Sequence, residues 1–384
     1  MIKNDVPNGK GGDGMSEKII VRDAAAADRK DFHRLWKACF HDSDAFCRWF
    51  FENRFLPEYS VCLETEGEFA SCMQAYPYIV WLRGREIPGA MLCGVSTDPI
   101  HRKKGYMGKI FSYEMEMLRQ KGILVAPHTP AVLESYFSFG HFPVADASYL
   151  ECECVPRYPV SKEIHLLSAK ADFEQIYPVY LSFAKKYSGM ILRSKTDFLR
   201  KCDDYAADGG KCIAYVKNGE RKGYCFFYQT EERVDCVEAI AEDGSFYALL
   251  EGLYPYAEGR ALTVKLPPDL LLSCPFGKTT RRQKGVMGLC NLQGLLRLLD
   301  LNLPYGFFVK DSVIAENNGC FDFKGNPYNK APVFEIEAGR LLQVLTGYHT
   351  LGELKQNIKI YDEAAFGEID RLLPKCSCYI IDEY

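Results

Sequence analysis

Three consecutive cations in the first third of the sequence follow a strongly apolar run and precede a glycine that opens a helical pattern. The residues in and around this turn are Val95, Thr97, Arg102, Lys103, Lys104, Gly105, Met107 and Gly108. Backbone N–H groups at such a turn point outward together, and the helix dipole favours an anion there. The glycine lets the backbone approach closely, and the cations neutralise phosphate charge. The segment is therefore suited to a diphosphate, although a solvated basic turn has the same composition.

Two aromatic segments form a second group of candidates. Residues 136–142 read Tyr-Phe-Ser-Phe-Gly-His-Phe, and the chain ends in Tyr-Ile-Ile-Asp-Glu-Tyr at 379–384. The phenol of Tyr136 has a reference pKa of about 10, so at neutral pH it is protonated and can donate a proton. Packing in a core is the alternative, because three phenylalanines stand close by. The last six residues do not resemble a loose tail, which indicates that the C-terminus is held in place.

Alternating strand and helix patterns place the cationic turn in an α/β domain. The predicted elements are a strand at 18–22, a helical region at 28–53, strands at 60–64, 69–81 and 86–97, a helix from the turn to Gly122, a strand at 123–126 and a short helix at 130–139. From Ala90 the apolar residues are nearly continuous, which is typical of a strand buried on both faces. This order predicts a βαβα unit around the turn.

The rest of the chain predicts two further domains. Beyond a proline-bearing boundary at 155–160, the expected elements are helices at 173–186 and 196–205, strands at 212–217, 223–229 and 234–241, a helix at 245–256 and a strand at 261–266. This order resembles that of the first domain and indicates a diverged duplication. Pro267, Pro268 and the basic run 278–284 mark a second boundary, followed by an α+β domain. The expected division is a tail at 1–15 and domains at 16–154, 155–274 and 275–384.

Composition and charge exclude several functional classes. The 384 residues are 47% hydrophobic, and a net charge of −4 gives no basic field for nucleic acid or an anionic membrane surface. No apolar run approaches the roughly 18 residues of a membrane helix, and residues 1–14 lack the apolar core of a secretory signal. We therefore expect a multidomain cytoplasmic protein whose 16 scattered cysteines are reduced.

Two cysteine pairs raise the question of a metal. Cys152 with Cys154, and Cys376 with Cys378, each place two thiols on one face of a strand, and four thiolates suit tetrahedral zinc. No local Cys-x-x-Cys pair and no histidine partner accompanies them. We therefore expect reduced core thiols and no metal.

The order of the first segments resembles the GNAT N-acetyltransferases. The shared features are R-x-x-G after an apolar strand, an amphipathic helix, a short strand and the aromatic segment at 136–142, although Met107 stands where the motif has Gly or Ala.

A closer resemblance is to the enhanced intracellular survival (Eis) acetyltransferases. It rests on Phe40, Asp42, Trp49, V-x-T-x-P-x-H-R-x-x-G at 95–105 and Y-x-x-F-G-H at 136–141. Residues 337–348 and 378–384 resemble that family's sterol-carrier-like domain and aromatic C-terminus. The resemblance therefore spans the chain.

The resemblance implies an N-acetyltransferase with tandem GNAT domains, the second of them GNAT-like but without the phosphate turn, followed by a sterol-carrier-like C-terminal domain. It also implies a hexamer built as a trimer of dimers. Acetyl-CoA is the implied co-substrate, held by the eight residues around the cationic turn. Tyr136 is the implied general acid, and the terminal carboxylate of Tyr384 is the implied general base. The implied acceptor site is an anionic, aromatic pocket for a cationic polyamine or aminoglycoside, lined by Phe40, Asp42, Trp49 and Glu383.

Two other functions are compatible with the same resemblance. A protein lysine as acceptor requires an open groove rather than an enclosed pocket, and a non-catalytic chain would bind CoA without turnover. His101 and His128 are either proton relays or ordinary surface or hydrogen-bonded histidines. Arg221-Lys-Gly223 partly repeats the cationic turn, but strand patterns flank it, so we expect a hairpin turn there.

Overall fold

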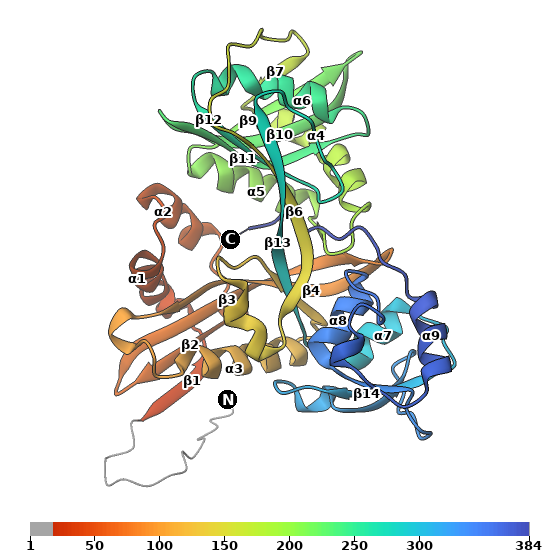
Figure 1. Ribbon diagram of the computed structural model, residues 1–384. Helices are drawn as coiled ribbons and strands as arrows, with labels where there is room; N and C mark the ends of the chain where they lie inside the picture. The colour runs from red at the N-terminus through yellow and green to blue at the C-terminus, as the bar shows by residue number, and fades with distance from the viewer. Residues whose placement is uncertain (1–17, 384) are drawn as a thin grey trace.

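The computed structural model describes residues 18–383, and most of its strands belong to one 13-stranded sheet (Figure 1). The first unit, residues 18–152, contains β1 (Ile19–Asp23), α1 (Arg29–Cys39), α2 (Asp44–Asn53), β2 (Ser60–Thr65), β3 (Glu68–Leu82), β4 (Arg85–Thr97), α3 (Tyr106–Gln120), β5 (Val125–His128) and β6 (Phe142–Cys152). The second unit, residues 155–266, contains β7 (Ile164–Leu167), α4 (Lys170–Ala184), β8 (Ile191–Leu192), α5 (Lys195–Ala207), β9 (Lys211–Lys217), β10 (Glu220–Gln229), β11 (Arg233–Ala241), α6 (Phe246–Leu253) and β12 (Ala261–Leu266).

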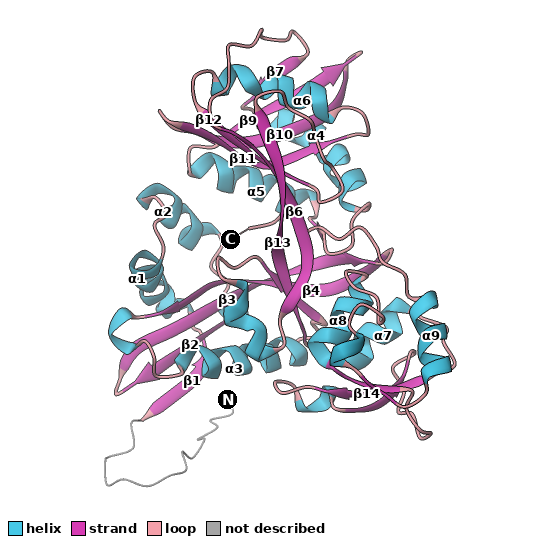
Figure 2. Cartoon of the chain, viewed as in Figure 1, coloured by secondary structure: helices cyan, strands magenta, loops and turns pink. Residues whose placement is uncertain are grey.

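The chain then passes through β13 (Gly277–Leu289) into a C-terminal unit, residues 290–373, and ends in a C-terminal tail, residues 374–383. The C-terminal unit contains α7 (Leu292–Leu299), β14 (Gly306–Lys310), β15 (Gly319–Asp322), β16 (Phe334–Glu337), α8 (Ala338–Thr346), β17 (Lys359–Ile360) and α9 (Glu363–Leu372). Figure 2 shows helices packed around both halves of the large sheet. None of the helices between residues 18 and 383 is long and apolar enough to cross a membrane.

The region predicted as helical at 28–53 is divided into α1 and α2 by a short loop. Phe40 has an extended backbone after α1, and Ser43 caps α2 by accepting a hydrogen bond from the N–H of Phe46 at 3.1 Å. A serine N-cap satisfies a donor that the start of a helix leaves without an intrahelical partner. The break places Asp42 on the loop between the two helices.

The first and second units repeat one strand topology. The strands β2, β3 and β4 pair antiparallel, and β5 then pairs with β4 in parallel after α3. The strands β9, β10, β11 and β12 repeat this pattern around α6. In each unit two helices precede these strands, and an earlier strand, β1 or β7, pairs antiparallel with β2 or β9. The strand directions thus agree with the predicted duplication.

The last strands of the two units are exchanged. The strand β6 follows β5 in the chain but pairs with β12 of the second unit, whereas β13 follows β12 but pairs with β5 of the first unit. They also pair with each other, and in Figure 1 they are the two long strands at the centre of the molecule. The two halves of the sheet are therefore continuous, and strand pairing crosses both predicted domain boundaries.

The basic run 278–284 lies inside β13, so our interpretation of it as a boundary was wrong. Arg281 Nε binds Asp146 of β6 at 2.7 Å, and Arg282 pairs with Glu151 of the same strand. Opposite charges on neighbouring strands support their pairing. Arg281 and Arg282 therefore take part in cross-strand pairs between β13 and β6, whereas Lys284 of the same run pairs with Glu383 of the tail.

The C-terminal unit has its own four-stranded sheet, β15-β14-β16-β17, and shares a core with the first unit. Val80 and Leu82 of β3 belong to the same buried cluster as Leu292 and Leu341. Arg83, at the end of β3, donates hydrogen bonds to carbonyl oxygens of the C-terminal unit and the tail, namely those of Val344, Leu345 and Pro374. These contacts fix the C-terminal unit against the first unit, while its relation to sterol carrier proteins stays a prediction.

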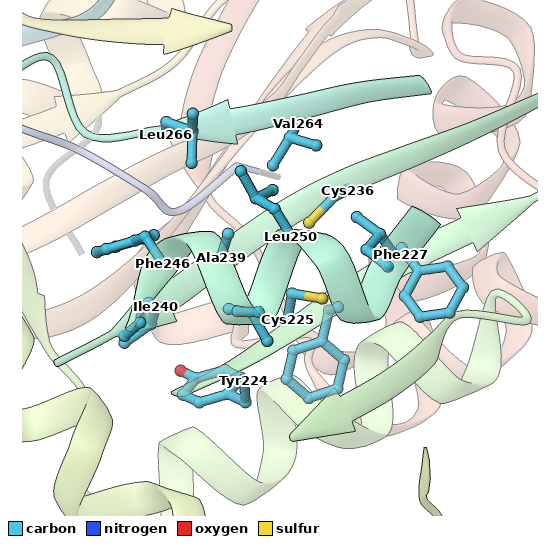
Figure 3. Packing of buried hydrophobic residues seen from close by; sticks show 14 of the residues in the cluster. Tyr224, Cys225, Phe227, Cys236, Ala239, Ile240, Phe246, Leu250, Val264 and Leu266 are labelled. Atoms are coloured by element: carbon cyan, nitrogen blue, oxygen red, sulfur yellow. The ribbon is translucent and has the colours of Figure 1, made fainter. Parts of the chain in front are cut away.

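The second unit has a separate, densely packed core (Figure 3). Phe246 and Leu250 of α6 lie over side chains of the underlying strands, including Cys225, Val264 and Leu266. Burial of these apolar side chains stabilises the unit by the hydrophobic effect. The core of this unit is therefore filled by side chains.

Candidate active site

The cationic turn connects β4 to α3 in a geometry suited to an anion. Asp98 fixes the turn by accepting hydrogen bonds from the N–H of Ile100 and from Arg34. Lys103 and Gly105 have φ values of +65° and +76°, and Gly105 is the N-cap of α3, where it places no side chain over the first N–H groups. Arg102, Lys103, Lys104 and Gly105 are all exposed. Cations and helix N–H groups thus face solvent together.

The first turn of α3 packs against the segment that carries Tyr136. A methyl group at Gly108 would lie 3.5 Å from Cε1 of Phe139. Arg102 donates from Nε to the carbonyl oxygen of Thr97 at 3.3 Å. The other predicted ligands of the co-substrate are half-buried at the end of β4 and in the first turn of α3, namely Val95, Thr97, Met107 and Gly108. The structure therefore brings the predicted co-substrate residues and the Tyr136 segment together.

A β-bulge lies in β4 just before the turn. The register with β3 shifts between Cys72 and Gln74, where Gly94 and Val95 take the place of one residue. Gly94 has a φ of +59°, and a Cβ there would approach the ring of Trp36 to 2.7 Å, so only glycine fits. Bulges redirect backbone groups and are common beside active sites.

The parallel ladder between β4 and β5 is much shorter than its counterpart in the second unit. Within residues 18–383, β4 and β5 pair at one position, Gly89 with Val125. In the second unit β11 and β12 pair at four positions. The edge of β4 beyond Gly89 therefore keeps backbone groups that β5 does not engage, and a linear ligand containing amides can pair with such an edge.

The corresponding turn of the second unit, between β11 and α6, is acidic. Glu242 binds Lys222 at 3.1 Å, and Asp243 binds Lys186 at 2.7 Å. Carboxylates at this position repel phosphate rather than attract it. Arg221-Lys-Gly223 does not form the predicted hairpin turn, because it lies within β10, after a turn at residues 218–219.

Tyr136 lies on a 3-10 helix (Leu133–Phe139) beside buried aromatic rings. Its ring is perpendicular to that of His128, with centroids 4.4 Å apart, and is 5.9 Å from Phe111. Burial raises the pKa of Tyr136 to about 12. The phenol is therefore fully protonated at neutral pH and can act as a proton donor.

His128 and His141 form a buried, neutral pair behind Tyr136. The distance from His128 Nε2 to His141 Nδ1 is 3.0 Å. Burial lowers the pKa of His128 to about 3 and that of His141 well below its usual value. Both imidazoles are therefore neutral at pH 7, and His128 Nε2 is engaged with its partner. His101 lies elsewhere, 3.2 Å from Glu68.

The predicted acceptor residues Phe40, Asp42 and Trp49 lie on the loop between α1 and α2 and on α2. Asp42 accepts a hydrogen bond from Trp36 Nε1 at 2.8 Å, and the ring of Phe40 lies 4.9 Å from that of Trp36. The same loop contacts the second unit, because Ser43 donates a hydrogen bond to Asp208 at 2.8 Å. This side of the site is therefore built by both units.

Tyr228 of β10 faces this loop from the second unit. Burial raises the pKa of its phenol, and the carboxylates of Asp208, Asp204 and Asp42 raise it further. Asp204 is itself paired with Arg54 and Lys201, at 3.8 and 3.7 Å. The carboxylates of Asp42 and Asp208 near this ring favour a cation.

The C-terminal tail runs between the units and is bound to each of them. Ile380 belongs to the core shared by the first and C-terminal units, whereas Tyr379 and Ile381 belong to the core of the second unit. Lys201 of α5 donates to the carbonyl oxygen of Glu383 at 3.1 Å. Tyr384, the predicted base, lies outside the described residues, but its covalent neighbour is fixed at the junction of the units.

Glu383 is paired with two lysines. Its carboxylate oxygens lie 2.5 Å from Lys265 Nζ and 3.2 Å from Lys284 Nζ. Burial alone would raise the pKa of Glu383, but the two ammonium groups outweigh it and lower the pKa to about 2. Among the residues that the structure describes, no hydrogen bond or ion pair joins Glu383 to Asp42. Glu383 is therefore not joined to the other predicted acceptor residues by a hydrogen bond or an ion pair.

Comparison with known proteins identifies the region around the turn. Residues 20–144 match the model of the acetyltransferase (GNAT) domain, and this stretch contains the cationic turn, the bulge and Tyr136. Residues 20–144 are a GNAT acetyltransferase domain. The prediction of a GNAT-type acyltransferase is thereby confirmed, and GNAT domains use acetyl-CoA as co-substrate.

Solved structures share the fold over nearly the whole chain. A protein of unknown function from Enterococcus faecalis, described as a probable N-acyltransferase, is 17% identical with a TM-score of 0.78, over 96% of this chain and 100% of its own. A GCN5-related N-acetyltransferase from Anabaena variabilis is 14% identical with a TM-score of 0.78, over 96% and 100%. Eis1 from Mycobacterium abscessus is 15% identical with a TM-score of 0.73, over 95% and 100%. These likenesses show that the chain shares its fold with these proteins, Eis1 among them. No curated protein matches the chain in sequence.

Four buried cations, one within the GNAT domain and three in the second unit, were not singled out from the sequence. Arg54, Arg193, Lys201 and Lys265 are each at most 5% exposed. Sequence context contained a signal for two of them, because Lys265 interrupts the apolar strand β12 and Arg193 directly follows β8. A charge embedded in an apolar strand must be paired if it is buried.

The cysteines do not form the four-thiolate site considered above. Cys152 packs against Cys274 with their sulfur atoms 4.0 Å apart, while Cys376 and Cys378 contact Arg83 and Thr346. Within residues 18–383, no group of three or more His, Cys, Asp or Glu side chains could hold a metal ion.

Proposed function

We propose that this enzyme transfers the acetyl group of acetyl-CoA to a primary amine of a small cationic acceptor. The observation that carries the proposal is the meeting, within one GNAT domain, of the exposed cationic turn, the bulged edge of β4 and a protonated Tyr136. The turn suits the diphosphate of CoA through Arg102, Lys103 and Lys104 together with the N–H groups of α3. The free edge of β4 suits the amide-bearing pantetheine arm.

The reaction is direct transfer. The neutral amine nitrogen attacks the thioester carbonyl carbon, and the C–S bond then breaks. The nitrogen, positively charged after the attack, loses one proton and this proton restores the phenol that protonated the sulfur, so the products are the acetamide and CoA thiol. The acceptor ammonium must first lose a proton to a base. Tyr136 gives its phenolic proton to the departing sulfur, because its raised pKa keeps it protonated until the thiolate forms.

We assign the base to the terminal carboxylate of Tyr384. The support is the course of the tail, which enters the junction of the units and is anchored up to Glu383. Two nearby side chains that could otherwise serve are already engaged, because His128 Nε2 lies 3.0 Å from His141 Nδ1 and the carboxylate of Glu383 is held by Lys265 and Lys284. An α-carboxylate is ionised at neutral pH, and water can relay the proton to it.

A cationic acceptor is supported by the carboxylates near Tyr228. Asp42 comes from the first unit and Asp208 from the second, while Asp204 of the second unit is already paired with Arg54 and Lys201. An ammonium group is attracted by this charge, and the rings of Tyr228 and Phe40 provide aromatic surface. A polyamine or an aminoglycoside has the required chemistry. The proposal also includes a cytoplasmic location, a hexameric assembly and a sterol-carrier-like C-terminal unit. None of these three is needed for the chemistry of this site.

An amine panel tests the proposal. Acetyl-CoA and the full chain are mixed with polyamines, aminoglycosides, free amino acids and lysine-containing peptides, thiol release is followed, and products are identified by mass. We expect release with the polycationic small molecules and a mass gain of one acetyl group. Release only with peptides would make the acceptor a protein lysine, and acetyl-CoA binding without release by any amine would contradict an enzymatic role.

A further inference from the structure

The second unit repeats the GNAT topology without its ligand-binding features. Its strands β11 and β12 are paired at four positions, and its turn before α6 has carboxylates where the first unit has cations. On β11, which takes the place of β4 in the repeat, Glu238 is fully buried. The second unit therefore has a role other than co-substrate binding, and the buried charge of Glu238 indicates where to look for it.

Glu238 is part of a buried ion cluster that includes the C-terminal tail. Arg193 binds Glu238 with two hydrogen bonds of 3.1 and 2.8 Å and binds Asp382 from Nε at 3.0 Å. Arg193 and both carboxylates are at most 2% exposed. Tyr205 and Tyr224 donate their phenol protons to Glu238, which leaves the guanidinium as the link between β11 and the tail. A planar guanidinium suits such a bridge, because it offers several donors in fixed directions.

Neighbouring groups of the second unit hold the tail on either side of Asp382. Lys265 of β12 donates to the carbonyl oxygen of Ile381 at 3.0 Å and binds Glu383 at 2.5 Å. Lys201 of α5 donates to the carbonyl oxygen of Glu383. Three consecutive tail residues are thus bound by cations of one unit.

The first unit holds the tail at the same place. Thr129, next to β5, donates to the carbonyl oxygen of Asp382 at 3.2 Å. Thr129 also directly follows His128, whose ring contacts Tyr136. The anchored end of the tail is therefore brought close to the strand that flanks the proposed acid.

We propose that Arg193 is a positioning residue that fixes the C-terminal tail, with Lys265 as a second anchor, so that the second unit aims the terminal carboxylate at the reaction centre. This inference rests on the proposed function of that carboxylate. It gives the second unit a role as a receptor for the chain's own C-terminus, in place of a second co-substrate site.

The test uses Asp382→Asn in the full chain, because this change keeps the side-chain volume and leaves Arg193 paired with Glu238. Lys265→Met provides a second variant should the first not fold. Asp146→Asn is the matched control, since Asp146 also pairs with an arginine but lies on the cross-strand ladder of β6. The readouts are kcat as a function of pH, the dissociation constant of acetyl-CoA, and amide hydrogen exchange of residues 378–383.

We expect kcat of Asp382→Asn at pH 7 to fall at least about tenfold, with faster exchange in the tail and co-substrate affinity within about twofold of wild type. The loss in kcat should shrink toward pH 10, because a growing fraction of the acceptor amine is then already deprotonated in solution. The control should keep wild-type kcat and tail exchange.

A purely structural role for Arg193 predicts lower stability but an unchanged kcat and pH profile per folded molecule, and this result would overturn the proposal. An enzyme with an amidated Tyr384 separates the assignment of the terminal carboxylate as the base from the assignment of Arg193 as a positioning residue. If amidation abolishes activity and Asp382→Asn does not, only the positioning role is wrong. If amidation is harmless, the base is wrong and the positioning role is overturned with it.

Discussion

Tyr136 combines the two properties that a general acid for this reaction needs. Burial keeps its phenol protonated, with a pKa of about 12, and contacts with His128 and Phe111 fix the ring. We expect Tyr136→Phe to bind acetyl-CoA normally while kcat falls about 100-fold, the usual scale of general acid catalysis. Calorimetry for binding and thiol release for kcat check this.

Tyr113→Phe is the matched control for that substitution. Tyr113 is a partly buried tyrosine of α3, and burial also raises its pKa. Its phenol lies outside the proposed site, so its loss should leave kcat within about twofold. If Tyr136→Phe behaves like this control, Tyr136 is a packing residue. In the wild type we also expect no alkaline loss of kcat from Tyr136 below about pH 11, because its phenol ionises only above that.

The low pKa of His128 predicts that the free energy of unfolding depends on pH. Its pKa is about 3 in the folded state, against a reference of about 6.5 in an unfolded chain. Because the pKa of His128 is lower in the folded state, its neutral side chain contributes fully to the free energy of unfolding above pH 6.5. This contribution is lost as pH falls toward 3. From pH 7.5 to 5 this loss is about 2 kcal/mol. His128→Gln does not titrate, so the stability difference between wild type and variant should narrow by about that amount, as measured by urea unfolding. A pH-independent difference would contradict the assignment of a neutral His128.

Helix α3 offers a matched pair of glycines for testing the co-substrate site. Gly105 at its start and Gly122 just after its end have φ values of +76° and +80°, and neither has a neighbouring atom within 4 Å of an added Cβ. Leucine at either position therefore costs similar backbone strain, about 1–2 kcal/mol. Only Gly105 lies at the cationic turn.

We expect Gly105→Leu to weaken acetyl-CoA binding at least about tenfold, or 1.4 kcal/mol, because the side chain blocks the approach of the diphosphate. Gly122→Leu should lower the melting temperature similarly but leave the affinity within about twofold. Equal affinities of the two folded variants, measured by calorimetry, would refute the assignment of the turn.

Elements with local signals were predictable from sequence. The structure has three neighbouring features where the sequence pattern predicts them, namely the strand that ends at Thr97, the glycine at 105 and the apolar face of α3. All three lie close together in the sequence. The break at Asp42 was missed, because helical periodicity continues across it and only Ser43, as an N-cap, indicates it. The bulge at Gly94 was missed because it depends on the register with β3.

What the sequence could not reveal depends on contacts between distant residues. The exchange of β6 and β13 leaves no local pattern, so the basic run at 278–284 looked like a linker although Arg281 pairs with Asp146, 135 residues away. The same holds for the acceptor side, where Asp208 and Tyr228 of the second unit join residues of the first. The family resemblance indicated Tyr136 and the turn, but Arg193 became visible only through its partners.

The continuous sheet predicts that the molecule unfolds as one cooperative unit. Because β13 completes the first unit and β6 is shared with the second, neither has a complete sheet of its own. We expect a single transition in scanning calorimetry rather than one for each predicted domain. A chain that ends after Leu266 keeps all of residues 20–144 but lacks β13, and it should fail to bind acetyl-CoA. Separate transitions, or binding by the shortened chain, would contradict this account.

The central claim is that the enzyme uses its own terminal carboxylate as the base, and amidation of Tyr384 tests it most directly. A synthetic peptide of residues 376–384 can be joined to residues 1–375 at the native Cys376, once as the carboxylate and once as the carboxamide, and both products refolded. The amide keeps the aromatic ring and removes only the charge. We predict equal affinity for acetyl-CoA, a kcat at pH 7 about 100-fold lower for the carboxamide, and partial recovery at pH 10. Equal kcat for the two products across this pH range would contradict the claim.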